Sequence, residues 1–357
     1  MIGKLSAKAL RFWHPVMQGD TLRDAPVEIT LCGVELVVFR TASGQVAALD
    51  SRCPHRKMRL ALGRVEGEDI VCPYHGWRFG ADGSGHAPAT PAMKISTGCY
   101  QVREQHGAIW LRSAKDDGDG VADAAPALPP LDFPGYFPLR LLHHRVGAPF
   151  QLLIDNMAEL EHTATVHSVF GFDLKNMHLV KTDVTVSDTE LDIYYEGPQR
   201  KLPFYLAIPT AIEADDRFVQ RAKVRFGPVH ATYDLEWHAP GTDRLRPVQL
   251  KFVIFFNPST EGRCEQFTFV YASASNPVLA KIVKTFSWLL VNSFNKELLA
   301  DIALVESLQL SPEHYAEYLP SRCDRPLREA PRMIDTLYFN NNETAPGHAA
   351  VMMKRSG

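Results

Sequence analysis

Short runs of β-branched and aliphatic residues, separated by turn residues, dominate the first third of the chain. Cys32-Gly33 separates two such runs and is the two-residue signal of a tight hairpin. The pattern predicts an all-β domain over residues 1–113, with two ligand-bearing loops at hairpin tips. The strand-like runs lie at residues 27–31, 34–38, 45–49 and 109–111.

The pattern changes after this domain. Residues 114–134 are rich in Asp, Gly, Ala and Pro, a composition typical of a linker. Apolar periodicity then predicts a helix over 151–167, and one long helix or two abutting helices over 278–308. We therefore predict an α+β chain, with a helix-decorated antiparallel sheet over 135–345 and a tail at 346–357. Its strand-like runs lie at residues 191–195, 219–226, 232–237, 248–256 and 266–272.

Composition narrows the class of protein. Of the 357 residues, 45% are hydrophobic and 22% charged, as in soluble globular proteins. The net charge of −3, with acids and bases mixed, does not indicate nucleic acid as a partner. The most apolar stretch, 282–290, contains Lys284 and is too short to span a bilayer. The start of the chain does not resemble a secretory signal, so we expect a cytoplasmic protein.

Four residues in two short strings form the first candidate site: Cys53 with His55, and Cys72 with His75. Two thiolates and two imidazoles suit a [2Fe–2S] cluster in which one iron has sulfur ligands and the other nitrogen ligands. The same set suits tetrahedral zinc. Both strings continue into proline and glycine with no recognition helix behind them, which favours the cluster.

A second candidate site lies in the predicted helix, where His162 and His167 are five residues apart. On a regular helix this spacing is roughly 500° of rotation, so the rings would point roughly 140° apart. They could bind one metal only if the helix ended or bulged between them. From spacing alone, two surface histidines remain an equally good interpretation.

Together the two sites resemble the Rieske non-haem iron oxygenases. The cluster strings match the pattern C-x-H-x16-C-x2-H, and Asn156, His162 and His167 match N-x2-D-x2-H-x4-H. The resemblance implies a [2Fe–2S] cluster on the first four residues and mononuclear Fe(II) on the two histidines and a later aspartate. Asp301, in the string Asp-Ile-Ala-Leu-Val-Glu, is our choice for that aspartate. The alternatives are Glu297 and Glu306.

One position departs from the family pattern, because Glu159 stands where most relatives have aspartate. In the family, this carboxylate links a cluster histidine of one subunit to an iron-ligating histidine of its neighbour. Glutamate keeps the charge and adds one methylene, so we expect Glu159 to keep the role. The alternative is a solvated residue and impaired electron transfer.

The resemblance also implies a function. The chain would be a terminal oxygenase that uses dioxygen to hydroxylate, demethylate or N-oxygenate a small organic substrate. It would form a head-to-tail homotrimer without a small β subunit. No G-x-G-x-x-G follows a strand, so we expect NAD(P)H to be used by a separate reductase, with or without a ferredoxin. The rivals are a Rieske electron-transfer protein whose second domain only docks a partner, and a binding protein with a disabled iron site.

Overall fold

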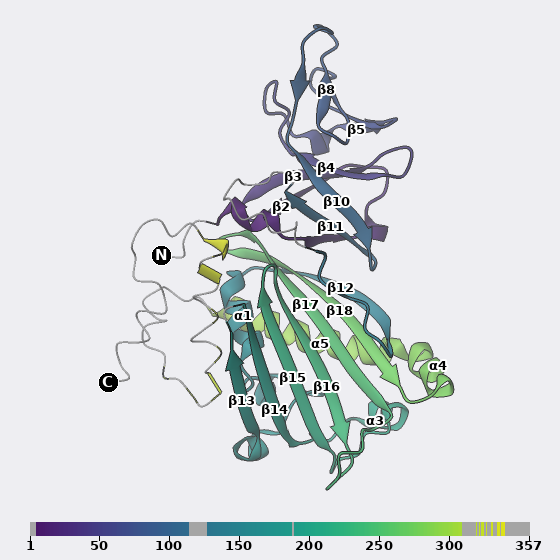
Figure 1. Cartoon of the computed structure of the whole chain (residues 1–357), viewed down its shortest axis with the longest axis vertical. Coiled ribbons are helices and arrows are strands. Elements are labelled where there is room, and N and C mark those ends of the chain that lie inside the picture. The colour runs from purple at the N-terminus through teal and green to yellow at the C-terminus, as the bar shows by residue number, and fades with distance from the viewer. Residues whose placement is uncertain are drawn as a thin grey trace. The chain divides into compact units, whose positions relative to one another are not determined.

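The computed structural model describes residues 5–113, 127–187, 189–308, 319, 321, 323, 324, 326, 330, 334, 335 and 337–339 (Figure 1). The chain divides into two compact units. One contains Leu5–Pro129 and Asn257–Glu261; the other contains Pro130–Phe256 and the residues from Gly262 onward. Most of the predicted linker and the whole predicted tail lie outside the described residues.

The first unit consists of two antiparallel sheets. The larger has the order β1 (His14–Gln18), β11 (Ala108–Ser113), β10 (Cys99–Gln105), β4 (Val46–Asp50), β3 (Val34–Arg40), β2 (Val27–Leu31). The smaller has the order β5 (Arg64–Glu66), β6 (Asp69–Val71), β7 (Arg78–Phe79), β8 (Ser84–His86), β9 (Ile95–Ser96). The predicted hairpin is confirmed, because β2 and β3 pair around Cys32 and Gly33, whose φ angles of 50° and 77° suit a tight turn.

The second unit is a seven-stranded antiparallel sheet with helices, as Figure 1 shows. The strand order is β12 (Tyr136–Val146), β18 (Arg263–Ala274), β17 (Val248–Thr260), β16 (Val229–His238), β15 (Arg217–Phe226), β14 (Glu190–Pro198), β13 (Lys181–Val186). The α-helices are α1 (Phe150–Ala158), α2 (Thr163–Val166), α3 (Phe204–Thr210), α4 (Pro277–Thr285) and α5 (Ser287–Ser307). Short 3-10 turns are η1 (Ala7–Arg11), η2 (Gly19–Thr21) and η3 (Leu60–Leu62) in the first unit and η4 (Leu174–Leu179) in the second. The predicted α+β class is confirmed.

Alternating burial explains how this sheet carries a site. Along β14 and β16 buried and half-buried residues alternate, so each strand turns one set of side chains toward a packed face. The inner strand β17 is buried at almost every position. Helix α5 crosses the sheet in Figure 1, and α1 packs on α5. Side chains from β15, β16, β17 and α5 can therefore surround one space.

The structure corrects three details of the sequence prediction. The helix expected over 151–167 is two helices, because the chain is extended at Glu159, directly after α1. Strands β12 and β13 were not predicted; both are sheet edges, and β12 lacks regular alternation. The Cys72 loop lies at a hairpin tip between β6 and β7, whereas the Cys53 loop connects the two sheets and is closed by an isolated antiparallel bridge between Arg52 and Arg59. Region 278–308 forms two abutting helices, the second of the predicted alternatives.

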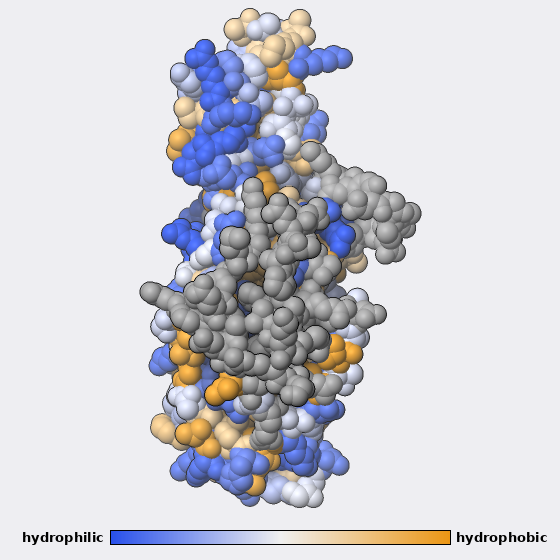
Figure 2. Space-filling view, turned by 90° about the vertical axis from the view of Figure 1, so that its left-hand side faces the viewer, coloured by the Kyte–Doolittle hydropathy of each residue, from blue (hydrophilic) through white to orange (hydrophobic). Residues whose placement is uncertain are grey.

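Where the face in Figure 2 is not drawn in grey, small groups of hydrophobic residues are scattered among polar ones. Among the described residues, no helix is both long and apolar enough to cross a membrane.

A buried histidine makes the second unit sensitive to acid. His230 is 5% exposed, stacks on Phe255, and donates from Nδ1 to the carbonyl of Pro228 at 2.7 Å. Burial, opposed by that hydrogen bond, lowers the pKa of His230 to about 4. The unfolded chain binds this proton near its ordinary pKa of about 6.5, so stability is lost as pH falls from there toward 4.

We therefore expect the free energy of unfolding to fall by roughly 3 kcal/mol more in the wild type than in His230→Leu between pH 7 and pH 4. Urea titrations of both proteins across this range measure the difference. Parallel pH profiles would show that His230 does not carry the effect.

Candidate functional site

The two cysteine loops share one backbone design. In the loops 53–58 and 72–77, the N–H of the cysteine donates to the carbonyl five residues later, at 2.9 Å and 2.8 Å. Its carbonyl accepts from the N–H four residues later, at 2.9 Å and 3.1 Å. The fifth residue of each loop is left-handed, with φ of 58° at Lys57 and 70° at Gly76. The two loops therefore present their cysteines in similar ways, while the histidine is the third residue of one loop and the fourth of the other.

The loops turn their sulfur atoms inward and their imidazoles outward. Cys53 and Cys72 are 1% and 3% exposed and belong to an apolar core, whereas His55 and His75 are exposed. The two imidazole rings lie 4.6 Å apart, and His55 stacks on Trp77. Burial raises the pKa of Cys53 to about 11, so a positively charged centre is needed to hold it as a thiolate. This donor set fits a [2Fe–2S] cluster.

An interruption of the helix brings the two remaining histidines together. After α1 ends at Ala158, Glu159 is extended, and the four-residue helix α2 follows with His162 before it and His167 after it. The two rings are 5.1 Å apart at 84°. The break between helices is thus the interruption that a shared metal required at this spacing.

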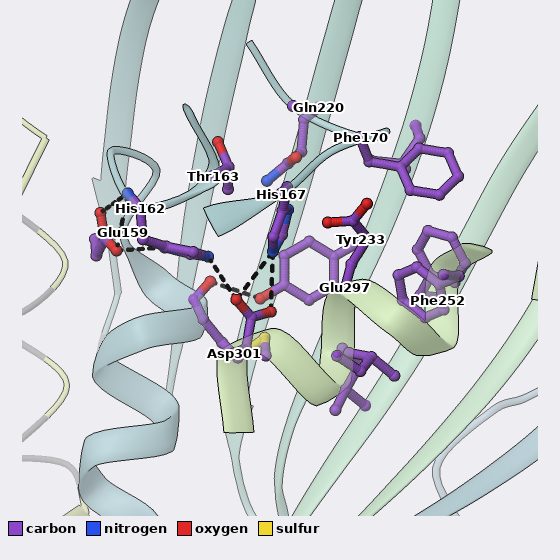
Figure 3. A pocket seen from close by; sticks show the side chains of 16 residues that line it. Glu159, His162, Thr163, His167, Phe170, Gln220, Tyr233, Phe252, Glu297 and Asp301 are labelled. Atoms are coloured by element: carbon purple, nitrogen blue, oxygen red, sulfur yellow. Dashed lines mark hydrogen bonds and ion pairs between the residues drawn. The ribbon is translucent and has the colours of Figure 1, made fainter. Parts of the chain in front are cut away.

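Asp301 of α5 completes the group. Its carboxylate oxygens lie 2.9 Å and 3.0 Å from Nε2 of His167, and Oδ1 lies 3.4 Å from Nε2 of His162 (Figure 3). One ligand atom from each of the three residues lies within 4.8 Å of the others. Two imidazoles and one carboxylate are the facial set that binds non-haem Fe(II) and leaves positions open. The residues fit mononuclear iron.

The two alternative carboxylates are occupied elsewhere. Glu297 accepts from the N–H and hydroxyl of Ser168 and from the N–H of Val169, at 2.9–3.1 Å. Glu306 accepts from the N–H of Gly147 at 2.6 Å. Of the three candidates, Asp301 is the one placed against both histidine rings.

Arg200 holds the segment that follows α2, a role the sequence did not indicate. Its guanidinium is largely buried and donates to the carbonyl of His167. It also donates to the carbonyls of Thr163, Ala164 and Phe172, at 3.3, 2.9 and 2.6 Å. Arg200 and Glu297 therefore fix the backbone of this segment through its carbonyls and its N–H groups respectively. A basic residue shortly after β14, followed by Lys201, gives no signal of this in the sequence.

Glu159 lies on the outer side of His162. One of its carboxylate oxygens is hydrogen-bonded to Nδ1 of His162, while Nε2 of the same ring faces Asp301. Burial lowers the pKa of His162, but Glu159 and Asp301 outweigh it and hold that pKa above its ordinary value. A carboxylate on the distal nitrogen fixes the orientation of a metal-binding histidine. Asn156 is buried on α1, and its Oδ1 has no hydrogen-bond partner among the described residues.

A pocket opens beside this group, between the sheet and α5 (Figure 3). Its empty space is about 570 Å³, open solvent at the mouth included. Phe252 and Phe294 stack at 3.7 Å in its wall, with Phe170 edge-on to both. The other lining residues are Met157, Glu159, His162, Thr163, His167, Gly171, Gln220, Tyr233, Leu235, Ile254, Glu297, Leu298 and Asp301.

The aromatic residues of this unit divide between the pocket, the core and the surface. Phe170 and Phe252 line it. Phe172, Phe255 and Phe256 are fully buried core residues outside the lining, and Phe204, Tyr205 and Trp288 are exposed. The lining residues Gln220, Tyr233 and Phe294 were missed, because strand periodicity shows which residues share a face but not where the face is hollow.

Comparison with known proteins identifies one domain of the chain and relates the chain's fold to solved structures. Residues 12–101 match the family described as Rieske [2Fe-2S] domain. The chain is 31% identical over 166 residues to 4beta-methylsterol monooxygenase of Methylococcus capsulatus, covering 42% of this chain and 43% of that protein. It is 35% identical over 168 residues to the oxygenase component of chloroacetanilide N-alkylformylase of Rhizorhabdus wittichii, covering 43% and 45%. These matches span less than half of each relative.

Solved structures match over almost the whole chain. Dicamba monooxygenase bound to 3,6-dichlorosalicylic acid superposes with a TM-score of 0.72 at 20% identity, over 92% of this chain and 97% of that one. NdmA of Pseudomonas putida with caffeine gives 0.63 at 19% identity, over 95% and 98%. The chain therefore carries an N-terminal Rieske [2Fe–2S] domain in the fold of dicamba monooxygenase and the Ndm oxygenases, as its resemblance to the Rieske oxygenases implied.

Proposed function

We propose that this chain is the terminal oxygenase of a multicomponent Rieske system. In this proposal Cys53, His55, Cys72 and His75 hold the [2Fe–2S] cluster. His162, His167 and Asp301 hold mononuclear Fe(II). The observation that carries the proposal is the convergence of two imidazoles and one carboxylate on one side of a pocket, in a chain that also has a Rieske domain. A Rieske carrier protein has no need of this second set of ligands.

The iron would supply the centre at which dioxygen and electrons from the cluster oxidise the substrate. The chain's own residues would prepare this centre. Arg200 and Glu297 fix the backbone on either side of His167, and Glu159 orients the ring of His162. The aromatic wall of the pocket would hold an organic substrate next to the metal and exclude water from it.

Relatives support the reaction class and leave the substrate open. They include proteins named as a 3-chlorobenzoate-3,4-dioxygenase oxygenase subunit, a vanillate O-demethylase oxygenase subunit and a chloroacetanilide N-alkylformylase oxygenase component. Hydroxylation, demethylation and N-oxygenation are therefore all within the proposal. We further propose a cytoplasmic homotrimer that receives electrons from an NAD(P)H-dependent reductase, either directly or through a ferredoxin.

Electron transfer is proposed to cross a subunit interface at Glu159. Its carboxylate already accepts from Nδ1 of His162, and its second oxygen lies 3.3 Å from the N–H of the same residue. That longer contact leaves acceptor capacity for a further donor. His75 of a neighbouring subunit is exposed at the tip of its loop, so its ring could be that donor. Asn156 is proposed to support this junction from α1.

The cluster ligands are tested by a single replacement. Cys72→Ala removes one of two thiolates, and we expect loss of the visible absorption and of the Rieske-type electron paramagnetic resonance signal of the reduced protein. Lys57→Ala, in the Cys53 loop, changes no ligand, so this variant should keep both the visible absorption and the electron paramagnetic resonance signal. A colourless wild type that binds one zinc ion and no sulfide would exclude the cluster.

The iron ligands are tested separately from the cluster. His162→Ala and Asp301→Ala should lower the iron content from about three to about two atoms per chain, because only the mononuclear metal loses a ligand. Product formation should fall at least about 100-fold, while the cluster spectrum stays unchanged. Glu306→Gln is the matched carboxylate control. If Asp301→Ala keeps its third iron while Glu297→Gln or Glu306→Gln loses it, Asp301 is not the ligand.

The role of Glu159 is tested by rate and by complementation. Glu159→Gln should keep both metals but slow iron reduction by the cluster about 10- to 100-fold, since the amide is neutral and orients the ring less well. Glu159→Asp should have a smaller effect. Oligomers mixed from Cys72→Ala and His162→Ala chains should recover partial turnover, because an intact cluster then faces an intact iron site. Verified mixed oligomers without any turnover would rule out the route between subunits.

A further inference from the structure

The charges around the pocket limit what it can bind. Three carboxylates line it, from Glu159, Glu297 and Asp301, and no lysine or arginine is among its described lining residues. Glu297 is 3% exposed and forms no ion pair with a lysine or arginine of the described residues; its oxygens accept from N–H and hydroxyl donors. A carboxylate ligand here would lose its hydration without gaining a cationic side chain.

The rest of the pocket favours a flat, largely apolar molecule. The stacked pair Phe252 and Phe294, with Phe170 edge-on, forms a wall of ring faces and edges. Leu235, on β16, adds aliphatic surface to the lining. Such a wall binds aromatic or other planar ring compounds through stacking and apolar contact.

One neutral polar side chain in the pocket is available to hydrogen-bond to a ligand. Gln220, on β15, points into the pocket near Thr163 and His167 (Figure 3), and its amide makes no hydrogen bond to any other described residue. Tyr233 has its proton committed to the carbonyl of Met157 at 2.7 Å, so it can only accept from a ligand. Gln220 can both donate and accept, which suits a carbonyl, amide or lactam group.

We propose that the substrate is a neutral planar ring compound that hydrogen-bonds to Gln220 through a carbonyl or amide group, and that the pocket selects against carboxylates. The inference rests on the proposed function for the identity of this pocket as the substrate site. Selection arises from two features: an amide finds a hydrogen-bond partner in Gln220, whereas an acid meets the buried carboxylate of Glu297 and no lysine or arginine among the described lining residues.

Binding measurements with matched ligand pairs test this without turnover. Calorimetric titration of the metal-loaded protein would compare ring carboxamides with the acids of the same skeleton, beginning with 4-methoxybenzamide and 4-methoxybenzoate. We expect the amides to bind at least about tenfold more tightly than the acids. Gln220→Leu should weaken amide binding about three- to tenfold and leave acid binding unchanged.

A second experiment tests whether a cation in the pocket reverses the preference between amides and acids. Gln220→Arg places a cation in the pocket and should make the acids the tighter ligands. Thr232→Arg is the matched control, because it adds the same charge on the opposite face of the neighbouring strand β16 and should leave the order of the wild type. Acids preferred by the wild type, or no binding by any amide, would overturn the inference. Metal content and turnover report on the proposed function independently, so the two can fail separately.

Discussion

The site depends on one local event, the end of a helix at Ala158. Two histidines five residues apart cannot face one point from a continuous helix, and the extended residue Glu159 removes that obstacle. The four-residue helix α2 then separates the two rings so that both meet the carboxylate of Asp301. The sheet and α5 supply the rest of the site, with Asp301 on α5 and the pocket lining on β15, β16, β17 and α5.

Two buried charges of opposite sign stabilise α2 and the segment that follows it. Irregular backbone leaves carbonyls and N–H groups without helical partners, and these must be satisfied when buried. Arg200 takes up four carbonyls and Glu297 two N–H groups, each close to His167. A charged group that makes several hydrogen bonds recovers much of the free energy lost on burial. The same two side chains keep the ligand segment in place before any metal binds.

The sequence predicts the chemistry better than the shape. The four cluster residues, the two histidines and Asp301 are visible as motifs, because metal chemistry demands particular side chains at particular spacings. The hairpin at Cys32-Gly33 is equally visible, since only a few residues tolerate its turn. No sequence motif marks Arg200 or Gln220. Each acts through residues distant along the chain, and no local pattern marks a residue whose partners arrive only when the sheet has formed.

The edge strands show the same limit. Strand β12 contains arginine and two histidines, and it is placed by its pairing with β18 rather than by its own alternation. Helix α5 was predictable in extent but its internal geometry was not, because its apolar periodicity does not reveal which turn faces a hollow. Two successive turns of α5 face the pocket, and Phe294, Glu297 and Asp301 lie on their buried side.

This arrangement along α5 has a thermodynamic consequence. Phe294 and Asp301 are seven residues apart, so they lie on one face of the helix about two turns from each other. A ligand that displaces the Phe294 ring therefore acts on the same helix that carries Asp301. By reciprocity, any change that pocket filling makes in metal affinity is matched by an equal change that the metal makes in ligand affinity. Ligand binding in the pocket and metal binding at the site are then linked by a single coupling free energy.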